Sequence, residues 1–206
     1  MGLLLSPFPK AEPPDRRGRT RPPVGGRVSP RARTLIAGAA RHDVEEEAVE
    51  GFEGSVVAVF LTAEGGGTPV ETPSVNAVAG RGLEGDRYFA GAGTFIKDGA
   101  IEPRQEVTLI ESEAIEAAGR DYEIRLGLGD SRRNVVTSGV PLNHLIGREF
   151  VVGGARLRGL KLCEPCAYLE SKTMDGVRKA FAHRGGLRAQ ILESGTIEKG
   201  DAITPA

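Results

Sequence analysis

The segment Glu149-Phe-Val-Val-Gly-Gly-Ala-Arg-Leu-Arg-Gly-Leu-Lys-Leu162 indicates the class of fold. Two apolar-rich runs, residues 149–152 and 155–162, are separated by Gly153-Gly154, a dipeptide typical of β-hairpin turns. In the second run the alternation of apolar and polar residues shifts at Gly159, which predicts a β-bulge. We therefore expect two antiparallel strands joined by a tight turn, the second of them bulged.

Similar segments lie on both sides of this hairpin. Short apolar or alternating runs predict further strands at residues 55–62, 105–110, 133–137, 187–191 and 200–203. The 29 glycines, many of them between these runs, suit short strands and tight turns better than long helices.

Only two helices are predicted. One begins at Ser112 and ends at Gly119, and the other extends from Met174 to His183 between Thr173 and a Gly-Gly pair. A parallel βαβ sheet needs a longer helix after nearly every strand. The sequence therefore predicts a mainly β protein, a β-barrel with a few short peripheral helices.

The composition predicts one globular domain with a tail. Of the 206 residues, 39% are hydrophobic and 27% are charged, as in soluble globular proteins. No apolar stretch approaches the roughly 18 residues of a membrane span, so we expect a cytoplasmic protein without membrane contact. Two cysteines cannot form the disulfide framework of a small secreted protein, and they exclude a zinc site of four cysteines.

Residues 1–50 differ in composition from the remainder, and we expect them to be disordered. Residues 1–41 hold seven of the 13 prolines, nine Lys/Arg and two Asp/Glu, and residues 42–50 form an acidic linker. A targeting peptide and a nucleic-acid-binding arm are two functional interpretations. Because Leu3-Leu-Leu5 is too short for a signal sequence and the prolines disrupt an amphipathic helix, we favour a dispensable extension or a misassigned start. We place the folded domain at residues 51–206.

The charge of the predicted domain bears on its partners. Residues 42–206 hold 18 Lys/Arg and 26 Asp/Glu, so this part of the chain is acidic. An acidic surface repels phosphate backbones, and we expect no nucleic-acid binding.

Cys163-Glu-Pro-Cys166 is the motif with the most evident chemistry. Four interpretations of this motif are possible: half of a zinc site, a thioredoxin-like redox pair, one functional thiolate with a companion, or two buried structural thiols. Zinc needs four ligands, and neither a second C-x-x-C nor an H-x-x-x-H motif is present. A thioredoxin-like pair belongs in a βαβ unit before a long helix. Pro165 enforces a turn that fixes the direction of Cys166.

Three further segments combine glycine with charged residues. They are residues 82–88, with Asp86 and Arg87; residues 131–134, with Arg132, Arg133 and Asn134; and residues 183–186, with His183. Guanidinium groups and exposed N–H groups of loops suit phosphate. Ordinary solvated turns are the alternative interpretation for each segment taken alone.

Together, these segments resemble the MOSC domain, the C-terminal module of molybdenum-cofactor sulfurases, from about Gly51 to the end of the chain. The matching pieces occur in the family's order. They are Gly82-Leu-Glu-Gly-Asp-Arg87, Gln105-Glu-Val-Thr-Leu-Ile110, Arg132-Arg-Asn-Val-Val-Thr-Ser-Gly139, Pro141-Leu-Asn-His-Leu-Ile-Gly147, Phe150-Val-Val-Gly153, Cys163-Glu-Pro-Cys166, Gly185-Gly-Leu-Arg-Ala-Gln-Ile-Leu192 and Gly195-Thr-Ile-Glu-Lys-Gly-Asp201.

The resemblance implies a β-barrel and a set of site residues. Cys166 matches the family's key cysteine, which ligates molybdenum in some members and is proposed to carry sulfur as a persulfide in others. Arg132 and Asn134 match a segment near the cofactor, and Arg87 and Arg133 are further candidates to bind it. Independently of the resemblance, Asp86 and His183 are candidate proton relays because they are polar and lie in loops, and Cys163 is a candidate companion to Cys166.

The implied function is binding of the molybdenum cofactor (molybdopterin) by a cofactor-dependent reductase or a sulfur carrier, with a small-molecule substrate. A noncatalytic cofactor or small-molecule binding module is the alternative, and a domain with incidental thiols is a third hypothesis. Residues 1–50 are too few for a MOSC-associated N-terminal domain or a cysteine-desulfurase domain. We therefore expect a separate electron donor or cysteine desulfurase as partner, and no bound pyridoxal phosphate.

Overall fold

The computed structural model describes residues 51–96 and 100–206. Its strands are β1 (Gly54–Leu61), β2 (Val70–Thr72), β3 (Ser74–Val78), β4 (Gly82–Leu83), β5 (Val107–Glu111), β6 (Val135–Ser138), β7 (Glu149–Val152), β8 (Ala155–Leu162), β9 (Leu187–Glu193), β10 (Gly195–Glu198) and β11 (Ala202–Pro205). The α-helices are α1 (Ser112–Tyr122), α2 (Ala167–Lys172) and α3 (Val177–Ala180). The short 3-10 helices are η1 (Pro103–Gln105), η2 (Leu128–Ser131) and η3 (Leu142–Leu145).

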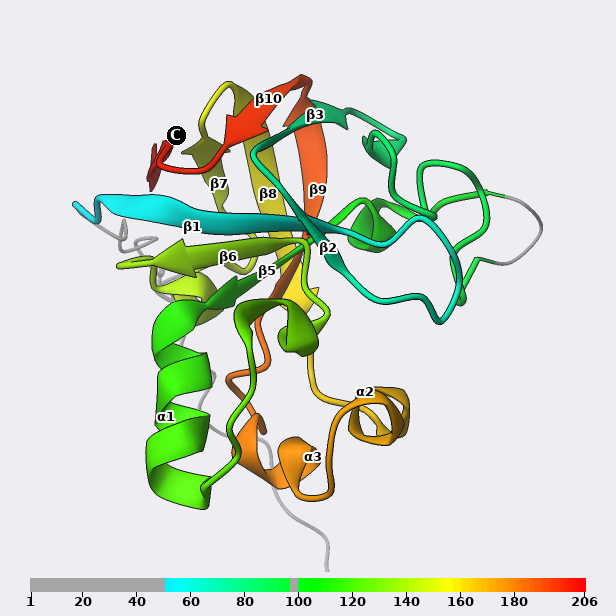
Figure 1. Cartoon of the computed structure of the whole chain (residues 1–206). Coiled ribbons are helices and arrows are strands. Elements are labelled where there is room, and N and C mark those ends of the chain that lie inside the picture. The colour runs from blue at the N-terminus through cyan, green and yellow to red at the C-terminus, as the bar shows by residue number, and fades with distance from the viewer. Residues whose placement is uncertain (1–50, 97–99) are drawn as a thin grey trace, which may run out of the picture. The chain divides into compact units, whose positions relative to one another are not determined.

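Seven strands close into a barrel, as predicted. They pair in the order β11-β7-β8-β9-β5-β6-β1, and β11 also pairs with β1 to complete the circle. A closed barrel satisfies the backbone hydrogen bonds that the edges of an open sheet leave unpaired. β2 extends the sheet beyond β1, and β10, β3 and β4 form a smaller second sheet (Figure 1).

The hairpin of β7 and β8 has the predicted bounds, and its bulge lies where the sequence placed it. The register shifts between Gly159 and Lys161, so that Gly159 pairs with Ala189 but Lys161 pairs with Arg188. Val151–Val152 and Ala155–Arg156 pair directly across the Gly-Gly turn. The bulge moves the cleft-facing side chains of β8 by one position, which matters for the site below.

One pair of strands is parallel, β5 with β6, and α1 connects them. Ala114, Ile115 and Ala118 recur at helical spacing on the buried face of α1. The predicted end at Gly119 is wrong: the helix continues to Tyr122 and ends at Glu123, which adopts φ 59° and donates its N–H to the Ala118 carbonyl. An isolated glycine inside a helix costs only about 1 kcal/mol, and tertiary packing of the apolar face overrides it.

Two hydrophobic cores lie on the two sides of the barrel wall. The larger core fills the barrel, and the smaller one lies between the outer face of the barrel and the helices. In β1, a bulge between Val56 and Ala58 points Val56 and Val59 into the barrel core and Ala58 and Phe60 toward the helices. Figure 1 shows α1 and α3 side by side below the strands.

The second predicted helix, residues 174–183, is wrong in its extent. Only Val177–Ala180 forms α3, and Gly176 immediately before it has φ 89°, which breaks the helical path. The sequence also missed α2, which begins directly after Cys166 and ends by Thr173. β2, β3, β4 and β10 were not predicted either, because strands of 3, 5, 2 and 4 residues are too short for a distinctive pattern.

The prediction of a disordered segment at residues 1–50 lies outside the described residues. Among the described helices, none has both the length and the apolar character needed to cross a bilayer.

Candidate functional site

The floor of the candidate site is a row of polar side chains that crosses three adjacent strands and ends just before a fourth. Lys161 on β8 pairs in register with Arg188 on β9, and Arg188 pairs with Thr108 on β5. The next member, Asn134, precedes β6 and exchanges hydrogen bonds with Thr108. Because their neighbours Leu187 and Ala189 point into the barrel core, these side chains face outward.

A cleft with two lobes lies over this row. The outer lobe has a volume of about 420 Å³, and its side chains are those of Thr94, Phe95, Ile96, Glu102, Arg104, Gln105, Lys161, Glu164, Cys166 and Arg188. The inner lobe, of about 70 Å³, is lined by Arg87, Tyr88, Phe95, Gln105, Thr108, Arg132, Arg133, Asn134, Cys163, Glu164, Cys166, Tyr168, Leu169 and Arg188. Five residues belong to both lobes, and Cys166 is one of them. The cysteine therefore lies where the two lobes meet.

The two cysteines differ in environment. Cys163 is 2% exposed, and its N–H donates to the carbonyl of Gly186 at 2.7 Å, so it belongs to the packed end of β8. Cys166 is exposed, lines the cleft, and immediately precedes α2. Both thiols are free. The structure thus gives a buried structural position to one cysteine and an accessible position to the other.

Glycine holds the cysteine loop from the other side. A Cβ on Gly185 would lie 2.7 Å from the Cys163 carbonyl oxygen and 3.0 Å from Pro165 Cδ. A Cβ on Gly186, which has φ 104°, would clash with the carbonyl group of Leu109. The Gly-Gly pair, predicted as a phosphate-binding turn, therefore allows the backbone to pack against the cysteine loop and β5.

Arg133 is a buried clamp on this loop. It is 8% exposed, and its guanidinium donates to three carbonyls: Gly185 at 2.8 Å, Cys163 at 2.8 Å and Ser131 at 3.1 Å. These bonds join three segments that are distant in sequence. The side chain lines the inner lobe, but most of its hydrogen-bonding capacity is used on the protein itself.

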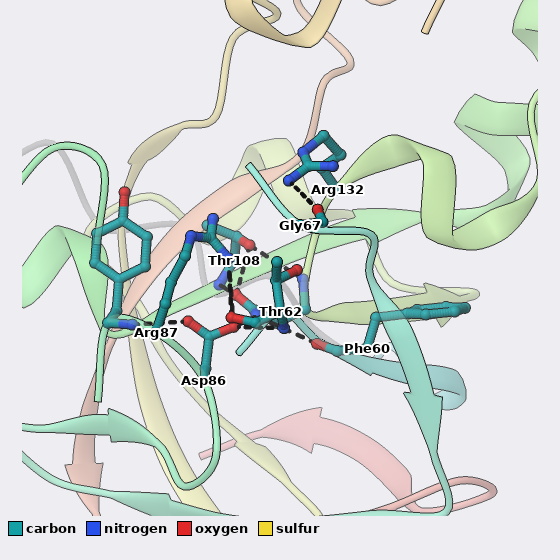
Figure 2. Close-up of polar contacts among 9 residues, drawn as sticks. Phe60, Thr62, Gly67, Asp86, Arg87, Thr108 and Arg132 are labelled. Atoms are coloured by element: carbon teal, nitrogen blue, oxygen red, sulfur yellow. Dashed lines mark hydrogen bonds and ion pairs between the residues drawn. The ribbon is translucent and has the colours of Figure 1, made fainter. Parts of the chain in front are cut away.

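Asp86 also has an internal role. It is 3% exposed, and its carboxylate accepts hydrogen bonds from the N–H groups of Thr62 and Tyr88, both at 3.0 Å. Asp86 Oδ2, which accepts the bond from Thr62, also lies 3.4 Å from Asn134 Nδ2 and 3.6 Å from Arg87 Nη1 (Figure 2). Asp86 therefore orients Arg87 and Asn134 on the wall of the inner lobe without lining the lobe itself.

Arg87 and Arg132 have capacity left for a ligand. The buried Nε of Arg87 has no hydrogen-bond partner among the described residues, and the Arg87 guanidinium lies 5.0 Å from the Tyr88 ring centre. Arg132 donates one bond, from Nη2 to the Gly67 carbonyl at 2.9 Å (Figure 2). Its guanidinium lies 5.7 Å from the Tyr168 ring centre. Arg132 also adopts φ 57°, a conformation that is rare for non-glycine residues and concentrated at functional sites.

His183 lies away from the inner and outer lobes. Its side chain is 88% exposed, and Nδ1 lies 3.1 Å from Glu164 Oε1, while its N–H donates to Glu164 Oε2. The ring lines a separate shallow depression beside α3. His183 thus contacts the cleft through Glu164, which precedes Cys166 by two positions in the sequence.

The cleft is positively charged within an acidic domain. Its basic residues are Arg87, Arg104, Arg132, Arg133, Lys161 and Arg188, and its carboxylates are Glu102 and Glu164. Burial raises the pKa of the Tyr88 hydroxyl, and the charges of Arg87 and Arg188 offset part of this rise. Tyr88 therefore remains a neutral hydrogen-bond donor at the cleft wall. This set of donors suits an anionic ligand.

The sequence analysis identified some of the residues that line this cleft. The structure brings Arg87, Arg132, Arg133, Asn134, Cys163 and Cys166 together around the inner lobe, as expected of one site. Lys161, Glu164, Tyr168 and Arg188 were missed as site residues. Lys161 and Arg188 lie in strands, where a charged residue on an outward position reads as solvated, and only the register reveals that they are neighbours.

Among the described residues, no three His, Cys, Asp or Glu side chains group in a way that could hold a metal ion. A site built from protein ligands alone, such as structural zinc, therefore has no support in this part of the chain. Any metal at Cys166 would need ligands from a bound molecule.

Comparison with known proteins gives a consistent result. A model of the MOSC domain family matches residues 97–204, just over half of the chain. A search of curated proteins finds no match.

Three solved structures have similar folds. The YuaD protein from Bacillus subtilis is 18% identical, with a TM-score of 0.61 over 73% of this chain and 94% of that chain. YiiM from Geobacillus stearothermophilus is 16% identical, with a TM-score of 0.57 over 74% and 75%. YiiM from Escherichia coli is 16% identical, with a TM-score of 0.53 over 74% and 69%.

Proposed function

Because the chain belongs to the MOSC domain family, we propose that it binds the molybdenum cofactor in the two-lobed cleft and uses Cys166 as the functional thiolate. The observation that carries this proposal is the position of Cys166, an exposed thiol at the junction of two lobes lined by basic residues. A thiolate is both a soft ligand for a transition metal and a sulfur nucleophile.

The residues present suit a phosphate-bearing pterin. Buried polar groups in proteins are almost always satisfied, so the Nε of Arg87 calls for an acceptor that the described part of the chain does not supply. Arg132 retains free N–H groups on the same lobe. The outer lobe, at about 420 Å³, falls in the range of about 300–1,000 Å³ that is usual for small-molecule sites.

Each element of the chain has a definite task in this proposal. Arg87 and Arg132 bind the anionic end of the cofactor, and Asp86 orients Arg87. Arg133 and Gly185 fix the loop that presents Cys166. Cys163 is a buried companion that packs the end of β8. When bound, the cofactor would supply a redox-active metal that exchanges electrons or sulfur with a substrate.

Reductase and sulfur carrier are the two activities that such a site can support. In either case we propose that the electrons or the sulfur come from a separate protein, an electron donor or a cysteine desulfurase. A noncatalytic binding module has the same cleft and differs only in the absence of turnover.

The test is the content of the protein purified from a host that makes the cofactor. We expect molybdenum and pterin to copurify with the wild type and with Cys163→Ser, and to be lost with Cys166→Ser, since a hydroxyl is a hard and largely protonated donor. Intact-mass detection of an additional sulfur on Cys166 would identify the carrier, and turnover of N-hydroxylated substrates the reductase. Equal metal content in all three proteins, or zinc as the metal, contradicts the proposal.

A further inference from the structure

Two like charges oppose each other directly on the cleft floor. Lys161 and Arg188 are register partners on the antiparallel strands β8 and β9. Side chains of directly opposite residues lie about 5 Å apart at Cβ, and like charges in this position destabilise the sheet. The pair exists because the bulge after Gly159 places Lys161, and not Leu160, opposite Arg188.

Among the described residues, no carboxylate forms an ion pair with either member of this pair. Within residues 51–96 and 100–206, Lys161 makes no hydrogen bond or ion pair, and Arg188 donates one bond, to the Arg104 carbonyl at 3.3 Å. The nearby Arg104 is itself paired with Glu102 at 2.6 Å, and the Glu164 carboxylate is engaged by His183. Neither cation of the pair therefore has a carboxylate within ion-pair distance among the described residues, and both line the outer lobe, where an external anion can reach them.

We propose that Lys161 and Arg188 form an anion subsite in the outer lobe that selects substrates carrying a carboxylate or a phosphate. The anion bridges the two charges and relieves their repulsion, so binding recovers the stability that the pair costs in the free protein. A repulsive pair that lowers the stability of the fold, and that no other contact compensates, is expected at a functional site.

The other residues of the outer lobe indicate the chemistry of the remainder of the substrate. Phe95, which is 51% exposed, and Ile96 line the outer lobe together with this pair. An exposed aromatic side chain beside two cations suits a planar apolar body with an anionic substituent. An organic anion held in this way extends to Cys166, which lines the same lobe. This assignment of a substrate class rests on the proposed function of Cys166, whereas the anion subsite itself does not.

The first test measures the alkylation of Cys166 in full-length protein made without the cofactor. Iodoacetate and iodoacetamide react with thiolates in the same way but differ in charge, so the ratio of their rates reports the local attraction for anions. Charged clefts concentrate counter-ions, and we expect Lys161→Gln to lower the iodoacetate-to-iodoacetamide ratio about three- to tenfold. Arg158→Gln is the matched control, because Arg158 lies on the same strand but is paired with Glu149. Its ratio should stay within about twofold of the wild type, and the wild-type ratio should fall with salt. An unchanged ratio in Lys161→Gln overturns the subsite.

The second test distinguishes a substrate anion from the phosphate of the cofactor itself. Binding of 4-fluorobenzoate to cofactor-loaded protein is followed by fluorine NMR. We expect binding to the loaded wild type and a Kd at least about fivefold higher in Lys161→Gln. If the loaded protein binds no fluorobenzoate while the alkylation ratio behaves as expected, the pair holds the cofactor's phosphate and the substrate assignment is wrong. If no cofactor can be loaded but the ratio falls in Lys161→Gln, the anion subsite stands and the proposed function of Cys166 fails.

Discussion

Replacing Arg133 by alanine should destabilise the domain far more than replacing its neighbour Arg132. Arg133→Ala removes three hydrogen bonds from a charged donor and leaves the carbonyls of Gly185, Cys163 and Ser131 without that partner in a buried position. Hydrogen bonds of charged groups contribute about 1–3 kcal/mol each, and losses are not additive, so we expect a total of about 3–5 kcal/mol. For a domain of this size, that corresponds to a fall in Tm of about 10–15 °C.

Arg132→Ala is the matched control because it removes the same charge at the adjacent position. Arg132 is half-buried and donates one bond to a carbonyl, so its loss should cost about 1 kcal/mol or less. Calorimetric melting of the two variants, with alkylation of Cys163 as a local probe, measures the difference. Arg133→Ala should also make Cys163 reactive, since its loop loses the clamp. Equal melting shifts in the two variants, or a larger shift in Arg132→Ala, would refute this role.

Three further outcomes are expected. Cys166→Ser should leave Tm within about 2 °C of the wild type, because the side chain is exposed. Cys163→Ser should lower Tm, because a hydroxyl enters a buried apolar position. Melting curves compare the two variants, and equal shifts in Tm would contradict the difference in burial. Gly185→Ala should lower the free energy of unfolding by about 1–3 kcal/mol and change the alkylation rate of Cys166, because the new methyl group meets the cysteine loop. Unchanged stability and unchanged reactivity of Cys166 would show that the loop is free to move. Burial raises the pKa of Glu106 above its ordinary value of 4.5, so its stabilising contribution is present at acidic pH and is lost as the pH rises through that raised pKa. Glu106→Gln should flatten the fall in Tm as the pH rises above 4.5, and parallel pH profiles of Tm would disprove it.

The barrel could be predicted from sequence because its signals are local. The Gly153-Gly154 turn, the bulge at Gly159 and the alternation in residues 187–191 each specify structure within a few residues, and all three are confirmed. The bounds of the helices were less accessible. α1 continues through Gly119 because its apolar face packs on the strands, and the second helix breaks at Gly176.

The site was predictable only in part, for a related reason. Loops with glycine and arginine pointed to Arg87, Arg132 and Asn134, which do line one lobe. The sequence could not show that Arg133 spends its donors on carbonyls from residues 131, 163 and 185, because those contacts depend on the folded chain. Nor could it reveal the opposition of Lys161 and Arg188, since register across strands is set by the barrel and the bulge.

The most direct test of the account is whether the bound cofactor covers Cys166. The rate of Cys166 alkylation by iodoacetamide is measured by peptide mass spectrometry with and without reconstituted molybdenum cofactor. With nine-tenths of the sites filled, we predict that the rate falls about tenfold, the limit set by the unfilled tenth, while buried Cys163 reacts slowly in both states. An unchanged rate at Cys166 in protein that holds the cofactor would place the cofactor elsewhere and contradict the assignment of this cleft.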